Sequence, residues 1–104
     1  MRERVYFEFQ VEQPVRAVPG GVRPRYPDNL RASALEGEVQ AQFVVDTAGR
    51  VVPGSLKVLR STHDLFTAAV RVAVDSMTFT PARIGGQKVK QLVQQPFQFQ
   101  LARP

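Results

Sequence analysis

The chain has 104 residues, the size of one globular domain, and its 43% hydrophobic and 22% charged residues argue against general disorder. It contains no cysteine, which excludes disulfides, thiolate chemistry and cysteine-ligated zinc. A net charge of +5 suggests an acidic partner or surface, but only Arg23 with Arg25 and Lys88 with Lys90 lie close in sequence, which favours a generally basic surface over a nucleic-acid-binding stripe.

Membrane and export segments are not expected in this sequence. No stretch approaches the roughly 18 consecutive apolar residues that a membrane span needs. The N-terminus is basic, but it then alternates between apolar and polar residues where a signal peptide would have a continuous apolar region. We therefore expect neither an anchor nor an export signal within these residues.

A strand is the first predicted element. Four apolar residues alternate there with Tyr, Glu and Gln: Val5, Phe7, Phe9 and Val11. The following stretch is rich in proline and glycine, which disfavour helix and sheet alike, so we expect a semi-extended tether. These patterns divide the chain into an N-terminal strand (1–13), a linker (14–25) and a folded domain (26–104).

A short helix and a hairpin are expected next. Tyr26-Pro27 introduces the helix, because proline suits a first helical turn. Its predicted core contacts are Leu30, Ala34 and, as a further candidate, Leu35, and Gly37 is the expected left-handed cap. Apolar alternation over 39–45 and again from 51 to 58, around the turn Asp46-Thr47-Ala48-Gly49, then predicts a β-hairpin.

The longest predicted helix follows Ser61-Thr62-His63-Asp64. Ser61 and Asp64 have the spacing of a capping box. Apolar residues then recur at helical spacing, while Thr67, Arg71 and Asp75 lie on the opposite side. Thr80-Pro81 is expected to end this region, and Gly85-Gly86 to turn the chain into the last strand.

The last predicted strand covers 89–101. Its odd-numbered apolar residues alternate with Lys and Gln, which indicates a half-buried strand. Pro96 cannot donate to a ladder, so it predicts an edge strand with the proline nitrogen outward, or a bulge. If the nitrogen is outward, four further residues present their backbone groups at this edge: Lys90, Leu92, Gln94 and Gln98. A partner strand would then pair with Lys90 to Gln94 and be interrupted at Pro96.

The expected fold class is α+β, a small antiparallel sheet with one long amphipathic helix and a short N-terminal helix packed on one face. The predicted core lies between the sheet and the long helix. Its members are Val39, Phe43, Val58, Phe66, Val70, Val74, Phe97 and Phe99.

Catalysis is not expected. His63 is the only histidine, and neighbours in sequence do not build a triad, so it is interpreted as a loop residue and not a base or ligand. One histidine and dispersed acids do not assemble a metal cluster, and the glycine pairs lack a phosphate-cradle context, so we expect no metal and no cofactor. Most aromatic residues share parity with the aliphatic ones, which favours core filling over base stacking.

Several short motifs follow one another in order over residues 25 to 101. The first motifs are Tyr26-Pro27, Leu30-Arg31 and Leu35-Glu36-Gly37-Glu38-Val39. The next are Phe43-Val44-Val45-Asp46, Gly49-Arg50-Val51 and Val58-Leu59-Arg60-Ser61, and the last are Phe79-Thr80-Pro81-Ala82, Gly85-Gly86 and Pro96-Phe97-Gln98-Phe99. Their order and spacing resemble the TonB C-terminal domain family, although Met77-Thr78 departs from the aromatic and basic pair that the family often carries there.

The resemblance implies a periplasmic domain of an energy transducer that is normally anchored in the inner membrane beside ExbB and ExbD motor proteins, although the anchor is absent from this chain. Such a domain captures the N-terminal box peptide of an outer-membrane transporter by strand addition and couples the proton motive force to uptake, for example of siderophores. The resemblance also implies that Arg25, Tyr26 and Pro27 lie near the peptide. An equally open interpretation is that Tyr26 and Pro27 only start the short helix and pack under it.

Two other hypotheses remain open. One is a cell-envelope structural, dimerising or wall-binding domain, and a more distant one is a nucleic-acid-binding sheet. The resemblance does not explain the N-terminal strand, whose four apolar residues would be costly to leave in water. We predict that Val5–Val11 adds to the sheet, on its own chain or on a neighbour's in a homodimer, and so competes with an incoming peptide.

Overall fold

The computed structural model describes residues 4–102, so residues 1–3 and 103–104, at the ends of the predicted segments 1–13 and 26–104, lie outside it. The two helices are α1 (Asp28–Ala32) and α2 (Asp64–Ser76), with a 3-10 turn η1 (Glu8–Gln10). The long strands are β3 (Gly37–Val45), β4 (Lys57–Ser61) and β7 (Gln87–Phe99). The short strands are β1 (Val5–Tyr6), β2 (Arg16–Ala17), β5 (Phe79–Thr80) and β6 (Ala82–Ile84).

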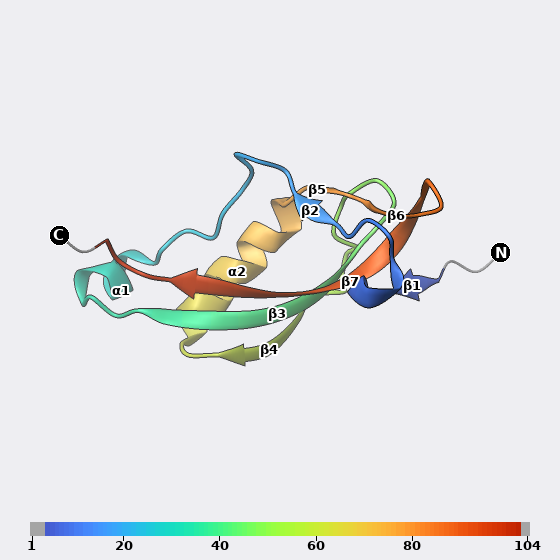
Figure 1. Cartoon of the computed structure of the whole chain (residues 1–104). Coiled ribbons are helices and arrows are strands. Elements are labelled where there is room, and N and C mark those ends of the chain that lie inside the picture. Colours follow the sequence, from blue (N-terminus) through green and yellow to red (C-terminus); the bar gives the residue numbers. More distant parts are fainter. Residues whose placement is uncertain (1–3, 103–104) are drawn as a thin grey trace.

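A mainly antiparallel sheet forms the body of the domain. Its strand order is β1-β7-β3-β4, with β6 also paired to β7, and β2 and β5 form a separate two-stranded ladder. Helix α2 crosses one face of this sheet, and α1 lies near one end of β3 and β7 (Figure 1). The predicted α+β class, with helices against an antiparallel sheet, is confirmed.

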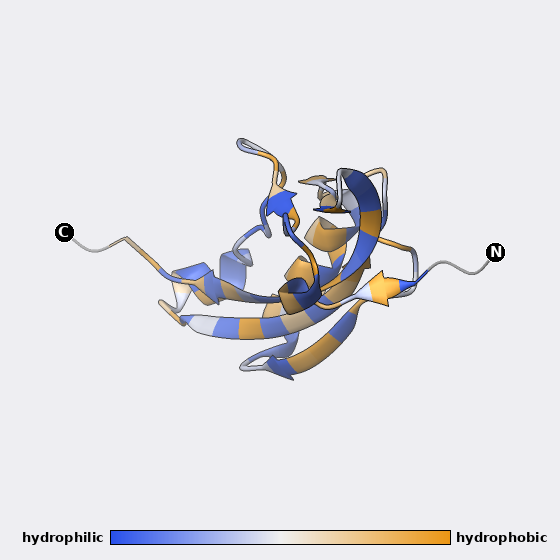
Figure 2. Cartoon of the chain, turned by 45° about the vertical axis from the view of Figure 1, so that its right-hand side comes forward, coloured by the Kyte–Doolittle hydropathy of each residue, from blue (hydrophilic) through white to orange (hydrophobic). Residues whose placement is uncertain are grey.

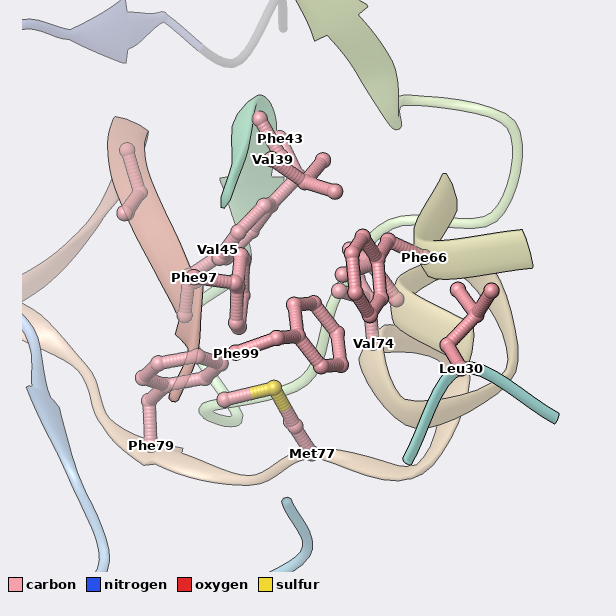
Figure 3. Packing of buried hydrophobic residues seen from close by; sticks show 13 residues of the cluster. Leu30, Val39, Phe43, Val45, Phe66, Val74, Met77, Phe79, Phe97 and Phe99 are labelled. Atoms are coloured by element: carbon pink, nitrogen blue, oxygen red, sulfur yellow. The ribbon is translucent and has the colours of Figure 1, made fainter. Parts of the chain in front are cut away.

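The core lies between α2 and the sheet, as predicted. Seven of the eight predicted members are buried, and Val58 is half-buried against them. Phe66 of α2 stacks on Phe99 of β7 with ring centroids 4.3 Å apart (Figure 3). Met77 and Phe79, which follow α2, complete the cluster beside Phe43 and Phe97.

Alternating burial confirms the predicted faces of the two central strands. Every second residue of β3 from Val39 to Val45 is buried, and in β7 the buried residues are Gln91, Val93, Phe97 and Phe99. The hairpin turn is also as predicted: the Asp46 carboxylate accepts from the N–H groups of Ala48 and Arg50, and Gly49 has φ +82°. A side-chain period of two is therefore a reliable guide in this sheet.

Several predicted details around the helices are wrong. Ala34 and Leu35 are exposed, so α1 contributes only Leu30 to the core. Ala34 takes the left-handed conformation at φ +56°, whereas Gly37 begins β3. A Cβ at Gly37 would lie 2.6 Å from the Phe66 ring, so glycine serves close packing there. His63 caps α2, since its Nδ1 accepts from the Leu65 N–H, so the expected Ser61–Asp64 box does not form.

The N-terminal segment differs most from its prediction. Strand β1 does add to the sheet of its own chain, parallel to β7, but it ends at Tyr6 and the 3-10 turn η1 follows. Phe7 and Phe9 are 49% and 84% exposed, so the expected burial of all four apolar side chains is wrong. Val11 is half-buried.

The predicted linker is not a free tether. Gln13 forms a bridge with Arg83, the Val15 N–H donates to the Gln91 side chain, and β2 pairs with β5. These contacts attach its first residues along β5, β6 and β7. Only the part that follows β2 leaves the sheet, and it returns at Tyr26, whose ring packs edge-on against Phe66 and Phe99.

Candidate binding edge

The outer edge of β7 is the candidate functional site. On its inner side β7 pairs with β3 in a continuous register from Gly37↔Phe99 to Val45↔Gln91. On its outer side, opposite β3, β1 pairs with Lys90 and Gln91, while β6 pairs with Gln87–Val89 beyond the end of the β3 ladder. Within residues 4–102, no strand pairs with the outer side of Leu92–Phe99.

Pro96 fixes which backbone groups face this edge. The ladder with β3 runs past the Gln40↔Pro96 pair without a register shift, so Pro96 is not at a bulge. A residue without an N–H fits a regular antiparallel ladder where its nitrogen points away from the partner strand. Since the direction alternates along a strand, Leu92, Gln94 and Gln98 also turn their N–H and C=O groups outward.

A groove runs along the second half of this edge. Its volume is about 670 Å³, and its floor and one side are formed by residues 95–100 of the chain. The opposite wall is the segment 17–24, which we call the arch; it rises from β2 and descends toward α1 above β7 (Figure 1). The unpaired edge therefore lies beside a concave surface.

The chemistry of the groove is mixed. Val18 and Val22 of the arch are 41% and 44% exposed and give it apolar surface, together with Met77. Arg23 and Arg31 also line it, whereas no carboxylate does so among the described residues. The groove thus suits an extended, partly apolar segment that is neutral or acidic.

The predicted site residues fall into three groups. Leu92, Gln94 and Gln98 lie on the unpaired part of β7, and Gln98 lines the groove. Lys90 lies where β1 already pairs, so the chain's own strand takes that position. The third group, Arg25, Tyr26 and Pro27, begins α1 beyond the end of the arch.

Tyr26 and Pro27 have clear structural roles. The Pro27 carbonyl accepts from the N–H groups of Leu30 and Arg31 at the start of α1. The Tyr26 hydroxyl donates to the Leu35 carbonyl, and the Arg31 guanidinium lies 5.2 Å from its ring centre. Tyr26 also lines the groove, so these contacts hold its ring at the groove wall.

Arg25 is directed elsewhere. Its guanidinium lies 3.8 Å from the Asp28 carboxylate, and both side chains are more than 80% exposed. Such an exposed pair contributes little to stability. Arg25 does not line the groove, although it borders a shallow apolar depression over α2.

The arch and Met77 were not predicted as site residues. Proline and glycine in 14–25 indicated a linker, and nothing in that pattern shows that a linker forms a wall. The available signal was the pair Val18 and Val22, two apolar residues in an otherwise unstructured stretch. No group of three or more His, Asp or Glu side chains within residues 4–102 is arranged to hold a metal ion.

An antiparallel sheet under one long helix, with an accessible edge strand beside a groove, defines the chain as a small α+β domain with an open sheet edge. The sequence matches the family described as Gram-negative bacterial TonB protein C-terminal over residues 22–101, most of the chain. The chain therefore belongs to the TonB C-terminal domain family.

One solved structure supports this assignment, and a second is reported as a weaker match. The solution NMR structure of the Pseudomonas aeruginosa TonB C-terminal domain matches with a TM-score of 0.69 and 26% identity, over 86% of this chain and 89% of that one. The Helicobacter pylori TonB C-terminal domain matches with a TM-score of 0.48 and 24% identity, over 78% of this chain and 72% of that one. No curated protein matches the sequence.

Membership of the family defines the general role of the domain. In this family the domain is a periplasmic, non-catalytic part of an energy transducer and interacts with outer-membrane transporters. Within the described part of this chain, no helix is long and apolar enough to cross a membrane.

Proposed function

We propose that the domain captures the extended N-terminal box peptide of an outer-membrane transporter, which adds as a strand to Leu92–Gln98 of β7. The observation that supports this proposal is the unpaired outer side of β7 beside the groove. Such an edge offers backbone donors and acceptors in a fixed row, and strand addition uses them regardless of most side chains.

The covered half of β7 sets the length of the proposed contact. Strand β1 takes the outer positions at Lys90 and Gln91, so the peptide adds from Leu92 onward. From Leu92 to Gln98 the strand extends about 20 Å at the usual rise per residue. A short peptide of about seven residues fills this stretch.

The groove supplies side-chain contacts in this proposal. Side chains of an added strand alternate between the two faces of the sheet. Those directed toward the α2 face would meet Tyr26, Met77 and the arch, which line the groove on that side. Those on the other face would lie beside the exposed amides of Gln94 and Gln98.

Energy coupling follows from this capture in the proposal. A peptide held by several backbone hydrogen bonds along one strand transmits tension along the strand direction. Motor proteins of the ExbB and ExbD type, acting through an inner-membrane anchor, would supply that tension for uptake of cargo such as siderophores. In this proposal the bound peptide is the link between the transducer and its transporter.

Paired substitutions at Gln94 test the proposal. Gln94→Pro removes one outward N–H but leaves the ladder with β3, whereas Gln94→Ala removes only the side chain. We expect Gln94→Pro to weaken binding of a synthetic transporter box peptide by about five- to a hundredfold in calorimetry, because the lost N–H leaves a peptide carbonyl unpaired, and Gln94→Ala to bind within about threefold of the wild type. Equal, full-strength binding by a folded Gln94→Pro variant would contradict the proposal.

A gain of binding provides the complementary test. Pro96→Ala adds an outward N–H in the middle of the edge, and one net hydrogen bond contributes about 0.5–1.5 kcal/mol. We expect the peptide affinity to rise by about two- to tenfold. If only concentration-dependent dimerisation responds to these variants in light scattering, the edge serves the alternative, dimerising function.

A further inference from the structure

The end of the domain opposite α1 carries a surface with both charged and apolar residues. The N-terminal part of this surface precedes residues 22–101, which match the family. The whole surface consists of residues 4–18 and the β6–β7 hairpin (82–90). Together they hold five cations, Arg4, Arg16, Arg83, Lys88 and Lys90, and two carboxylates, Glu8 and Glu12. The resulting +3 is most of the chain's net charge of +5, so the fold gathers at one end cations that are scattered in sequence.

Strand pairing places three of these cations on one face of the sheet. Arg83 pairs with Lys88, and Val5 pairs with Lys90, two residues further along β7. Paired residues direct their side chains to the same face, and so do residues two apart on one strand. This is the face opposite the core, because Val93, of the other parity, is buried in the core. One of the two carboxylates, that of Glu12, accepts from the Gly85 N–H.

An aromatic pair projects from the same end. The rings of Phe7 and Phe9 stack with centroids 5.6 Å apart and an interplanar angle of 15°, while remaining 49% and 84% exposed. The Phe7 N–H donates to Gln10 Oε1, and the Phe7 carbonyl accepts from the Gln10 N–H, both at 2.9 Å. Val5, 43% exposed, precedes them in β1, whose arrow is hydrophobic at the N-terminal end in Figure 2. The two Phe7–Gln10 hydrogen bonds close the backbone turn that carries the exposed Phe7 and Phe9 side chains.

We propose that this surface, formed by Val5, Phe7 and Phe9 with Arg4, Arg83, Lys88 and Lys90 around them, binds an anionic membrane surface. Aromatic rings partition into the interfacial region of a bilayer, and each nearby Lys or Arg is attracted to anionic lipid headgroups. The two rings stack on each other, so they form an apolar surface suited to acyl chains, whereas bases require ring faces left open for stacking. The surface binds at the interface and does not span the bilayer.

Vesicle binding tests the proposal with the complete chain. We expect the wild type to co-sediment with vesicles of phosphatidylglycerol and phosphatidylethanolamine, and only weakly with vesicles of phosphatidylcholine. The double variant Phe7→Ser with Phe9→Ser should have an affinity for anionic vesicles that is lower than that of the wild type by a factor of about ten or more. Lys88→Gln should weaken binding by about fivefold, because each cation near the surface contributes about 1 kcal/mol.

Matched controls come from the other end and face of the molecule. Val72 on α2 is 74% exposed, so Val72→Ser is the control for lost exposed apolar surface, and Lys57→Gln on β4 is the control for lost charge. Both should bind vesicles as the wild type does, and unchanged circular dichroism confirms that the variants fold. Absence of wild-type binding to anionic vesicles, or undiminished binding by the double Phe variant, would overturn the proposal.

Other occupants of the surface give distinct results. A second copy of the chain would produce concentration-dependent dimers, measured by sedimentation, that the double Phe variant loses without any vesicle dependence. A nucleic acid would produce binding to a single-stranded oligonucleotide that is tighter than binding to the vesicles and falls steeply with salt. Either result overturns the membrane assignment. Binding of the box peptide at β7 should be unaffected by the double Phe variant in all cases, which separates this proposal from the one above.

Discussion

The two halves of β7 belong to one continuous strand and have different surroundings. In the first half, Gln87–Gln91, β6 pairs with Gln87–Val89, β1 pairs with Lys90 and Gln91, and β3 reaches only Gln91; this half lies where the cations gather. The second half, Leu92–Gln98, pairs with β3 alone and faces the groove. The difference shows that a strand's sequence sets which residues are buried, while the neighbouring chain segments decide where its backbone stays available.

The largest expected effect comes from removing core packing that supports the second half of β7, Leu92–Gln98. Phe66 is fully buried and stacks on Phe99, and Phe97 is buried beside them, so both hold β7 against α2. Truncation to alanine removes this packing and leaves a cavity, so Phe66→Ala and Phe97→Ala should each lower the free energy of unfolding by about 3–5 kcal/mol. Urea denaturation measures this loss. Melting like that of the wild type in both variants would show that this half of β7 does not depend on this packing.

Removing residues 1–13 sharpens the comparison by turning part of the covered half into open edge. The deletion takes away β1 at Lys90–Gln91 and the Gln13 contacts with Arg83. We expect affinity for a box peptide to rise by about two- to tenfold, as one or two more backbone groups become available, and self-association to increase. Calorimetry and light scattering measure the two effects. If peptide affinity and the monomeric state both stay unchanged, β1 does not guard the edge.

The smallest expected effect concerns the wall of the groove. Tyr26→Phe keeps the edge-on contacts with Phe66 and Phe99 but removes the hydroxyl that donates to the Leu35 carbonyl. We expect a loss of about 1 kcal/mol in unfolding free energy with unchanged peptide affinity. Weaker peptide binding at unchanged stability would show instead that the hydroxyl contacts the peptide and not the start of α1.

The central elements could be predicted because their determinants are local. Alternation predicts which residues of β3 and β7 are buried, and Asp46 and Gly49 specify the turn that follows β3. Helical spacing predicts that Phe66 and Val70 of α2 face the core. The burial or conformation of each of these residues follows from a periodicity or a backbone preference that can be read directly from the sequence. The missing N–H of Pro96 likewise predicted which backbone groups of β7 face its outer edge.

The periphery could not be predicted, because its structure depends on which partners remain available. Alternation over 5–11 indicates a strand, yet β1 pairs with only two residues of β7 before the Gln10 side chain accepts from the Phe7 N–H and η1 turns the chain. Ala34 takes the positive φ expected of Gly37, since Gly37 is needed where the Phe66 ring approaches the backbone. The arch is a wall only because β2 pairs with β5 and Tyr26 packs on the core.

The attachment of the N-terminal segment to the C-terminal strands bears on how the chain folds. The Val15 N–H donates to Gln91, 76 residues further along, and β1 pairs with β7 next to it. Contacts between such distant residues form slowly, because closing a long loop costs entropy before any contact compensates for it. During synthesis the apolar residues at the start therefore have no partner until the last strand is made, and in that interval they are exposed to association with other chains.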